Sequence, residues 1–165
     1  MKLGILSDTH DHLPRITAAA AEFRKRGITR LIHCGDIVAP FALFPLKEAK
    51  FEECVGVYGN NDGEWRMLRE VFKNIGMIHK PPYFEEIAGR RFAILHEPQP
   101  DDVMASMPVD VVLFGHTHEI VIRPGKQGGG PLVLNPGEGC GYLNNRATVA
   151  ALDTETLEVE LIELP

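Results

Sequence analysis

The chain has 165 residues, is 44% hydrophobic and carries a formal net charge of -6 at pH 7. This length and composition predict one domain with a proper core, covering residues 1–165. The acidic balance argues against a broad nucleic-acid-binding surface, and no apolar run reaches membrane-spanning length. The amino terminus starts with a strand pattern and has no signal-peptide regions, and the three cysteines are too widely spaced for a disulfide framework or a thiolate zinc site. We therefore expect a cytoplasmic protein.

The first half of the chain predicts alternating strands and helices. Pro14 suits the first turn of a helix and Gly27 ends it, with apolar residues at helical spacing between them. We expect strands over 2–7, 29–34 and 55–58, and helices over 13–26, 41–49 and 64–74. Three strand-turn-helix units in succession imply parallel strands joined by right-handed crossovers.

The pattern changes from residue 77 onward, where paired strands dominate. We expect a strand over 109–114, a short helix over 100–107, and hairpins that join 83–87 to 91–95, 120–123 to 132–135 and 148–152 to 157–161. The glycine-rich segment 125–130 is typical of a mobile hairpin tip. This half predicts a mixed or antiparallel sheet packed against the first.

Five apolar runs end in side chains that can bind a metal ion. These side chains are Asp8 and His10, Asp36, Asn60, His96, and His116 and His118. The carboxyl ends of strands form the ligand-binding rim of open α/β sheets, so we expect the seven groups to converge. Nitrogen and oxygen donors without thiolate favour Mn, Fe, Ni, Zn or Mg over Cu(I) or an iron-sulfur cluster. Six of the groups suffice for one cation, and all seven suffice for two if a carboxylate bridges.

Several of these residue types also have ordinary structural uses. Asp8 and Asp36 could cap the helices that follow them, and Asn60 and Asn61 could be turn residues. His33 lies inside an apolar run, where a structural role is the expectation. The recurrence of such groups at five strand ends favours the ligand interpretation.

The motifs, in their order along the chain, resemble the calcineurin-like metallophosphoesterases. They are Asp8-Thr9-His10, Gly35-Asp36, Gly59-Asn60-Asn61-Asp62, His96 and Gly115-His116-Thr117-His118. The short chain and the segment Asn135-Pro136-Gly137 are similar to the small bacterial and archaeal phosphodiesterase branch. The resemblance implies an α/β fold, a two-sheet β-sandwich flanked by helices, with a dinuclear metal site at one edge.

The resemblance also implies a role for each matching residue. One metal would be held by Asp8, His10, Asp36 and His118, and the other by Asp36, Asn60, His96 and His116. Asp36 would bridge, and Asp36, Asn60 and His96 would act directly in the reaction. The expected cofactors are two divalent ions, Mn first, with Ni, Fe, Zn or Mg as alternatives. Two such ions, two aspartates and a bridging hydroxide that attacks phosphorus in line leave about one net positive charge, which suits a phosphate anion.

Three positions depart from the family pattern. Larger members carry a histidine at Asn61 that is thought to protonate the leaving group, and asparagine cannot do this. Asp62 or His12 are the candidate substitutes. Glu97 and Glu138 are expected to add negative charge near the substrate entrance, which could narrow the range of substrates or weaken the binding of anions.

The favoured function is that of a dinuclear metal-dependent phosphodiesterase or phosphatase acting on a small phosphodiester or phosphomonoester. The alternative is a non-catalytic metal-binding scaffold of the same fold that binds protein partners. A nucleic-acid substrate and a membrane partner are disfavoured by the charge and the hydropathy. Phe41, Phe44 and Trp65 are candidates for an exposed interface, and we expect a homodimer.

Overall fold

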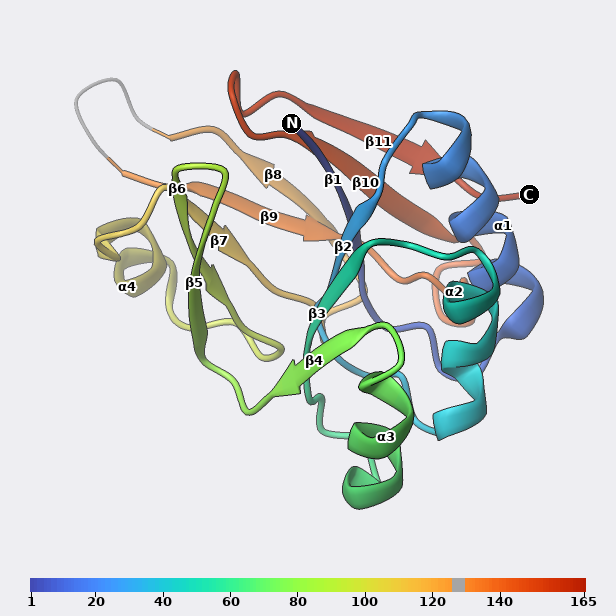
Figure 1. Cartoon of the computed structure of the whole chain (residues 1–165). Helices are drawn as coiled ribbons and strands as arrows, with labels where there is room; N and C mark the ends of the chain where they lie inside the picture. Colours follow the sequence, from blue (N-terminus) through green and yellow to red (C-terminus); the bar gives the residue numbers. More distant parts are fainter. Residues whose placement is uncertain (126–129) are drawn as a thin grey trace.

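The computed structural model describes residues 1–125 and 130–165 as four layers (Figure 1). Helices α1, α2 and α3 cover one face of a six-stranded sheet, a five-stranded sheet packs on its other face, and α4 lies outside the second sheet. The expected two-sheet sandwich flanked by helices is confirmed. The tip of the glycine-rich hairpin expected over 125–130 lies largely outside the described residues.

The first sheet has the order β11-β10-β1-β2-β3-β4. Its strands are β1 (Lys2–Leu6), β2 (Arg30–His33), β3 (Glu53–Val57), β4 (Gly76–His79), β10 (Thr148–Asp153) and β11 (Val159–Glu163). Strands β1 to β4 are parallel, so their carboxyl ends share one edge of the sheet. Strand β10 pairs antiparallel with β1 and adds the last hairpin.

The second sheet has the order β5-β6-β7-β9-β8. Its strands are β5 (Tyr83–Ile87), β6 (Arg90–Ile94), β7 (Val111–Leu113), β8 (Ile120–Arg123) and β9 (Leu132–Pro136). The three central strands β6, β7 and β9 are parallel, while β5 and β8 are antiparallel edges. The strands that precede His96 and His116 therefore end at the same edge of this sheet.

The helices lie close to their predicted positions. They are α1 (Leu13–Lys25), a 3-10 helix (Pro40–Leu43) followed by α2 (Phe44–Glu48), α3 (Trp65–Phe72) and α4 (Asp101–Ser106). The single helix expected over 41–49 is divided into these two short helices. No helix in the described part of the chain combines the length and the apolar character needed to cross a membrane.

Successive side chains of a strand point to opposite faces of the sheet, so the first sheet contributes to two cores, one beneath the helices and one between the two sheets. In β1, Leu3 and Ile5 point into the space between the sheets, whereas Leu6 belongs to the core beneath the helices. Leu3 and Ile5 belong to one buried cluster with Phe92 and Leu113 of the second sheet. Burial of both faces of the first sheet explains why its strands are nearly continuous apolar runs.

Two expectations about the sheets were wrong. No strand was expected over Gly76–His79, where Ile78 is the one buried side chain and the apolar signal is weak. The final hairpin was assigned to the second sheet, but β10 pairs with β1 through Lys2 to Ile5. That pairing joins the two ends of the chain and has no local signature in the sequence.

Candidate metal centre

The seven predicted ligands lie on turns that follow β1, β2, β3, β6 and β7. Backbone hydrogen bonds tie these turns together: the Thr9 amide donates to the Asp36 carbonyl at 3.0 Å, and the Gly115 amide donates to the His96 carbonyl at 3.0 Å. Five of the seven have positive φ angles, between 39° and 66°, namely Asp8, His10, Asp36, His116 and His118. Left-handed backbone at non-glycine residues is uncommon and gathers at functional sites, where neighbouring structure holds it.

Two buried carboxylates lie at the centre of the cluster. Ligand atoms of Asp8, His10 and Asp36 all lie within 4.8 Å of one another. Within residues 1–125 and 130–165, the ion pairs of both aspartates are with histidines alone. Burial raises the pKa of Asp8. Two buried carboxylates without a lysine or arginine partner favour the binding of a cation.

Asp36 is held in its ionised form by its neighbours. Burial acts to raise its pKa, but hydrogen bonds from His96 and Asn61 outweigh burial and hold that pKa well below its usual value. The Asn61 backbone amide donates to Oδ1 at 2.8 Å, and its side-chain amide donates to Oδ2 at 2.7 Å. Asn61 therefore orients the carboxylate that was expected to bridge the two metals.

His10 presents a buried nitrogen that has no partner. Its Nε2 makes no hydrogen bond with any residue that the structure describes, and it lies 3.5 Å from Oδ2 of Asp36 and 3.9 Å from Oδ1 of Asp8. Buried polar atoms in folded proteins are almost always satisfied, so this nitrogen needs an explanation. A cation between the nitrogen and the two carboxylates would satisfy all three groups.

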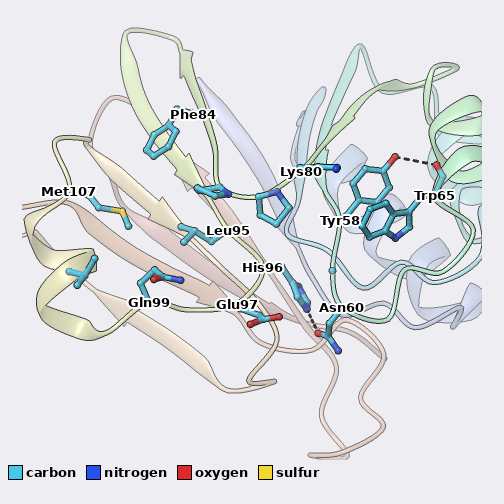
Figure 2. Close-up of a pocket in the computed structure, with 14 residues that line it drawn as sticks. Tyr58, Asn60, Trp65, Lys80, Phe84, Leu95, His96, Glu97, Gln99 and Met107 are labelled. Atoms are coloured by element: carbon cyan, nitrogen blue, oxygen red, sulfur yellow. Dashed lines mark hydrogen bonds between the residues drawn. The ribbon is translucent and has the colours of Figure 1, made fainter.

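His96 is fixed by the backbone. Its Nδ1 donates to the Cys34 carbonyl at 2.8 Å, which leaves Nε2 facing Oδ1 of Asp36 at 3.4 Å. The same Nε2 lies 2.8 Å from Oδ1 of Asn60, a contact shown in Figure 2. Burial acts to lower the pKa of His96, but the contacts with Asp36 and Cys34 outweigh burial and raise it. A proton or a metal ion is required between acceptor atoms that lie this close.

His118 is fixed by a second carboxylate. Its Nδ1 lies 2.8 Å from Oε2 of Glu138, while its Nε2 faces Oδ1 of Asp8 at 3.4 Å. Donation from Nδ1 to a carboxylate leaves Nε2 free to bind a metal, an arrangement common among metal-ligating histidines. Like His96, His118 therefore presents its Nε2 to a carboxylate in this cluster.

Asn60 and His116 complete the cluster. Oδ1 of Asn60 lies 2.8 Å from Nδ1 of His116 as well as 2.8 Å from Nε2 of His96. The His116 backbone amide donates to Oδ2 of Asp8 at 3.0 Å. The turn that carries His116 therefore contacts Asp8, an expected ligand of one metal, and Asn60, an expected ligand of the other. His116 is exposed at the rim, whereas Asp8, Asp36 and His96 are buried.

The cluster fits divalent cations by its own chemistry. It combines two buried carboxylates, a buried unsatisfied imidazole nitrogen and several pairs of acceptor atoms that face one another. Nitrogen and oxygen donors of this kind suit Mn, Fe, Ni, Zn or Mg. The structure brings all seven predicted residues together, and the assignment of each to a particular metal stays a prediction.

The two candidate substitutes for a leaving-group acid have other partners. The carboxylate of Asp62 is buried and accepts from the backbone amides of Gly59, Asp36, Ile37 and Val38. His12 caps α1, where its Nδ1 accepts from the Arg15 amide at 3.4 Å. Asp62 therefore holds the second and third turns together, and a role as leaving-group acid stays a prediction for both residues.

The expectation for Glu138 was wrong, because this side chain is 0% exposed and does not lie at an entrance. Burial acts to raise its pKa, but donation from Asn144 and His118 outweighs burial and lowers it. Glu97 is exposed and lines a cavity beside His96, as expected for a residue near an entrance. The role of Glu138 was missed because its contact with His118 spans 20 residues and depends on the tertiary fold.

Asn135 is a further supporting residue that the sequence marked only by its motif. Its buried side-chain amide donates to the Gly115 carbonyl at 3.0 Å and to Oγ1 of Thr117 at 3.1 Å, while its Oδ1 accepts from the Gly137 amide. Asn135 therefore holds the turn that carries His116 and His118.

Comparison with known proteins shows the family of this chain. A family model described as the calcineurin-like phosphoesterase superfamily domain matches residues 1–157. A phosphodiesterase of Methanocaldococcus jannaschii is 42% identical, and the match covers 99% of this chain and 99% of that protein. Among solved structures, an archaeal phosphodiesterase has a TM-score of 0.88 and 39% identity, covering 99% of this chain and 100% of the other.

A more distant structure shows the same fold. Yfce, a phosphoesterase from E. coli, has a TM-score of 0.70 at 22% identity, with 100% of both chains covered. The family model spans nearly the whole chain, and the M. jannaschii protein is similar over its full length. The chain therefore belongs to the calcineurin-like phosphoesterase superfamily.

Proposed function

We propose that this protein is a metal-dependent phosphodiesterase that uses two divalent cations, Mn first. The cations would be held by Asp8, His10, Asp36, Asn60, His96, His116 and His118. The observation that carries the proposal is the convergence of buried carboxylates and imidazole nitrogens that face one another at 3.4 to 3.5 Å. The names of the M. jannaschii protein and of the archaeal structure support a diester substrate.

When bound, the cations would lower the pKa of a water molecule to make a nucleophile and would neutralise charge on the phosphoryl oxygens. The chain's own residues set the geometry around them. Asp36 contacts both His10 and His96, which are expected ligands of different metals, and Asn61 orients its carboxylate. Asn60 supplies an oxygen ligand without adding negative charge, which preserves the site's attraction for an anion.

Protonation of the leaving group limits the range of substrates. Asn61 is engaged with Asp36, and Asp62 accepts four backbone hydrogen bonds. We infer that the enzyme favours leaving groups that depart as stable anions, such as nitrophenolates. Diesters of alcohols with high pKa values should be cleaved slowly by comparison.

The decisive experiment measures hydrolysis of bis-p-nitrophenyl phosphate by metal-stripped protein reloaded with Mn. Asp36→Asn and His116→Ala should both abolish metal-dependent turnover, because each removes a ligand from the cluster. Asp102→Asn is the matched control, since Asp102 is an exposed aspartate on α4 outside the cluster. Its turnover should equal that of the wild type.

The scaffold alternative predicts a different result. A protein that binds two metals per chain yet shows no turnover with any reloaded metal would contradict the phosphodiesterase proposal. Small phosphodiesters are the expected substrates, and phosphomonoesters come second. We further propose a cytoplasmic homodimer, with Phe41 and Phe44 as exposed apolar side chains at its interface, which light scattering in solution would test.

A further inference from the structure

A cavity of about 620 Å³ begins at the edge of the metal cluster (Figure 2). Asn60 and His96 belong to both the cluster and the wall of this cavity. From there the cavity extends between the turn after β3 on one side and strand β5 and helix α4 on the other. Its volume falls within the range of about 300–1,000 Å³ typical of small-molecule sites.

The far walls of the cavity are apolar and partly uncovered. Trp65 is 48% exposed and Phe84 is 55% exposed, and Val103 on α4 is also exposed. All three line the same cavity, so their apolar surface faces one hollow instead of being scattered over the molecule. Apolar surface gathered in a hollow beside polar groups is characteristic of ligand sites.

Trp65 is held rigidly although half of it is exposed. Its indole Nε1 donates to the Asp62 carbonyl, and its own carbonyl accepts from the Tyr58 hydroxyl at 3.2 Å. The Tyr58 and Trp65 rings are stacked, with centroids 5.2 Å apart and an interplanar angle of 24°. Asp62 is in turn bound to the Asp36 backbone. The stacked rings of Tyr58 and Trp65, which form the aromatic wall of the cavity, are therefore held in a fixed position relative to the metal cluster.

The charges around the cavity are few. Lys80 lies over the Trp65 ring, with its Nζ 5.6 Å from the ring centroid, and Glu97 is the acidic side chain in the lining. Neither forms an ion pair among the described residues. The cavity thus combines a flat aromatic surface with a single cation, which suits an aromatic group attached to a phosphate.

We propose that this cavity binds one ester substituent of the substrate and that this substituent is an aromatic ring. The proposal rests on the proposed function, because the phosphorus atom has to lie beside Asn60 and His96. The ring would then extend past His96 toward Trp65 and Phe84. The cavity makes the protein selective for aryl phosphoesters over alkyl phosphoesters of the same charge.

The test compares two stable probes, phenylphosphonate and methylphosphonate, by calorimetric titration into the Mn-loaded protein. Phenylphosphonate should bind at least about tenfold more tightly, as expected for burial of a ring. Trp65 is the single tryptophan of the chain, so its fluorescence reports on the cavity alone. Phenylphosphonate should change this emission, and methylphosphonate should leave it unchanged.

Two matched variants locate the effect. Phe84→Ala removes an exposed ring from the cavity wall and should reduce the preference for phenylphosphonate severalfold. Met77→Ala removes an apolar side chain of similar exposure, 64%, that does not line the cavity, and it should leave the preference at the wild-type value. Because both side chains are largely exposed, neither substitution is expected to unfold the protein.

The outcomes separate the two proposals. Equal binding of the two phosphonates by a protein that hydrolyses bis-p-nitrophenyl phosphate would overturn the aryl cavity and leave the phosphodiesterase intact. A preference without any change in Trp65 emission, or one that Met77→Ala reduces as much as Phe84→Ala, would also overturn it. Ring preference with Trp65 quenching but no metal-dependent turnover would support the cavity and overturn the proposed function alone.

Discussion

Nδ1 of His118 lies 2.8 Å from Oε2 of Glu138, a carboxylate with no exposed surface. Glu138 also accepts from the backbone amides of Leu143 and Asn144, and from the thiol of Cys140 at 3.4 Å. The carboxylate therefore holds the imidazole with its Nε2 directed at Asp8. Glu138 is a positioning residue for the metal cluster.

Replacing Glu138 by alanine should weaken metal binding about 10- to 100-fold, as is typical when the partner of a ligating histidine is lost. The substitution should also destabilise the protein by about 1–3 kcal/mol, because buried donors lose their acceptor. Calorimetric titration of Mn and urea unfolding would measure the two effects. Glu119→Ala is the matched control, since Glu119 is an exposed carboxylate next to His118. Equal Mn affinity in both variants would contradict the positioning role.

Gly59 should tolerate no side chain, because a Cβ at this position would lie 2.1 Å from Oδ1 of Asp36 and 2.4 Å from its backbone nitrogen. Gly59→Ala should displace Asp36 and abolish binding of at least one metal. Gly63→Ala is the matched control, because Gly63 lies four residues further on and a Cβ there meets nothing within 4 Å. Metal content measured by elemental analysis should fall in Gly59→Ala alone. Full metal content in that variant would contradict the expected displacement.

Asn60→Asp should weaken the binding of phosphate. The substitution places a negative charge at the oxygen that faces His96 and His116, and this charge cancels the excess positive charge expected of a loaded site. The inhibition constant of free phosphate against bis-p-nitrophenyl phosphate hydrolysis should rise about tenfold or more. An unchanged constant would show that Asn60 does not control the charge of the site.

His33 should make the metal-free protein less stable in acid. Its Nδ1 accepts from the Gly35 amide at 3.2 Å, so its Nε2 carries the proton and donates to Oγ1 of Thr9 at 3.1 Å. Burial lowers the pKa of His33 to about 3, below the usual value of 6.5. The unfolded chain therefore binds a proton that the folded protein excludes, and the free energy of unfolding falls as the pH drops from about 6.5 to about 3.

The expected contribution of His33 is about 1.4 kcal/mol per pH unit inside this window. Urea unfolding of the metal-free protein at pH values between 6.5 and 4 would measure it. In His33→Gln, the side-chain amide can keep both hydrogen bonds but does not titrate. The free energy of this variant should therefore fall less steeply, and parallel curves for the two proteins would refute the contribution of His33.

The sequence predicted the parallel strands and the residues at their ends because both depend on local signals. The apolar runs that became β1, β2 and β3 are each followed by a polar turn and a helix. The carboxyl ends of parallel strands meet at one edge, so the convergence of Asp8, Asp36 and Asn60 followed from connectivity. Strand β4 was missed because an edge strand with one buried residue, Ile78, carries little apolar pattern.

The tertiary structure decided what surrounds those residues. The pairing of β10 with β1, the contact of Glu138 with His118 and the cavity between Trp65 and Phe84 all join segments that are distant in the chain. The sequence by itself determined which side chains could act as metal ligands, because the residue types and the order of the strands along the chain can both be read from it. Burial determined the rest, because a carboxylate acts as an entrance charge when exposed and as a positioning group when enclosed, and enclosure depends on the packing of the whole chain.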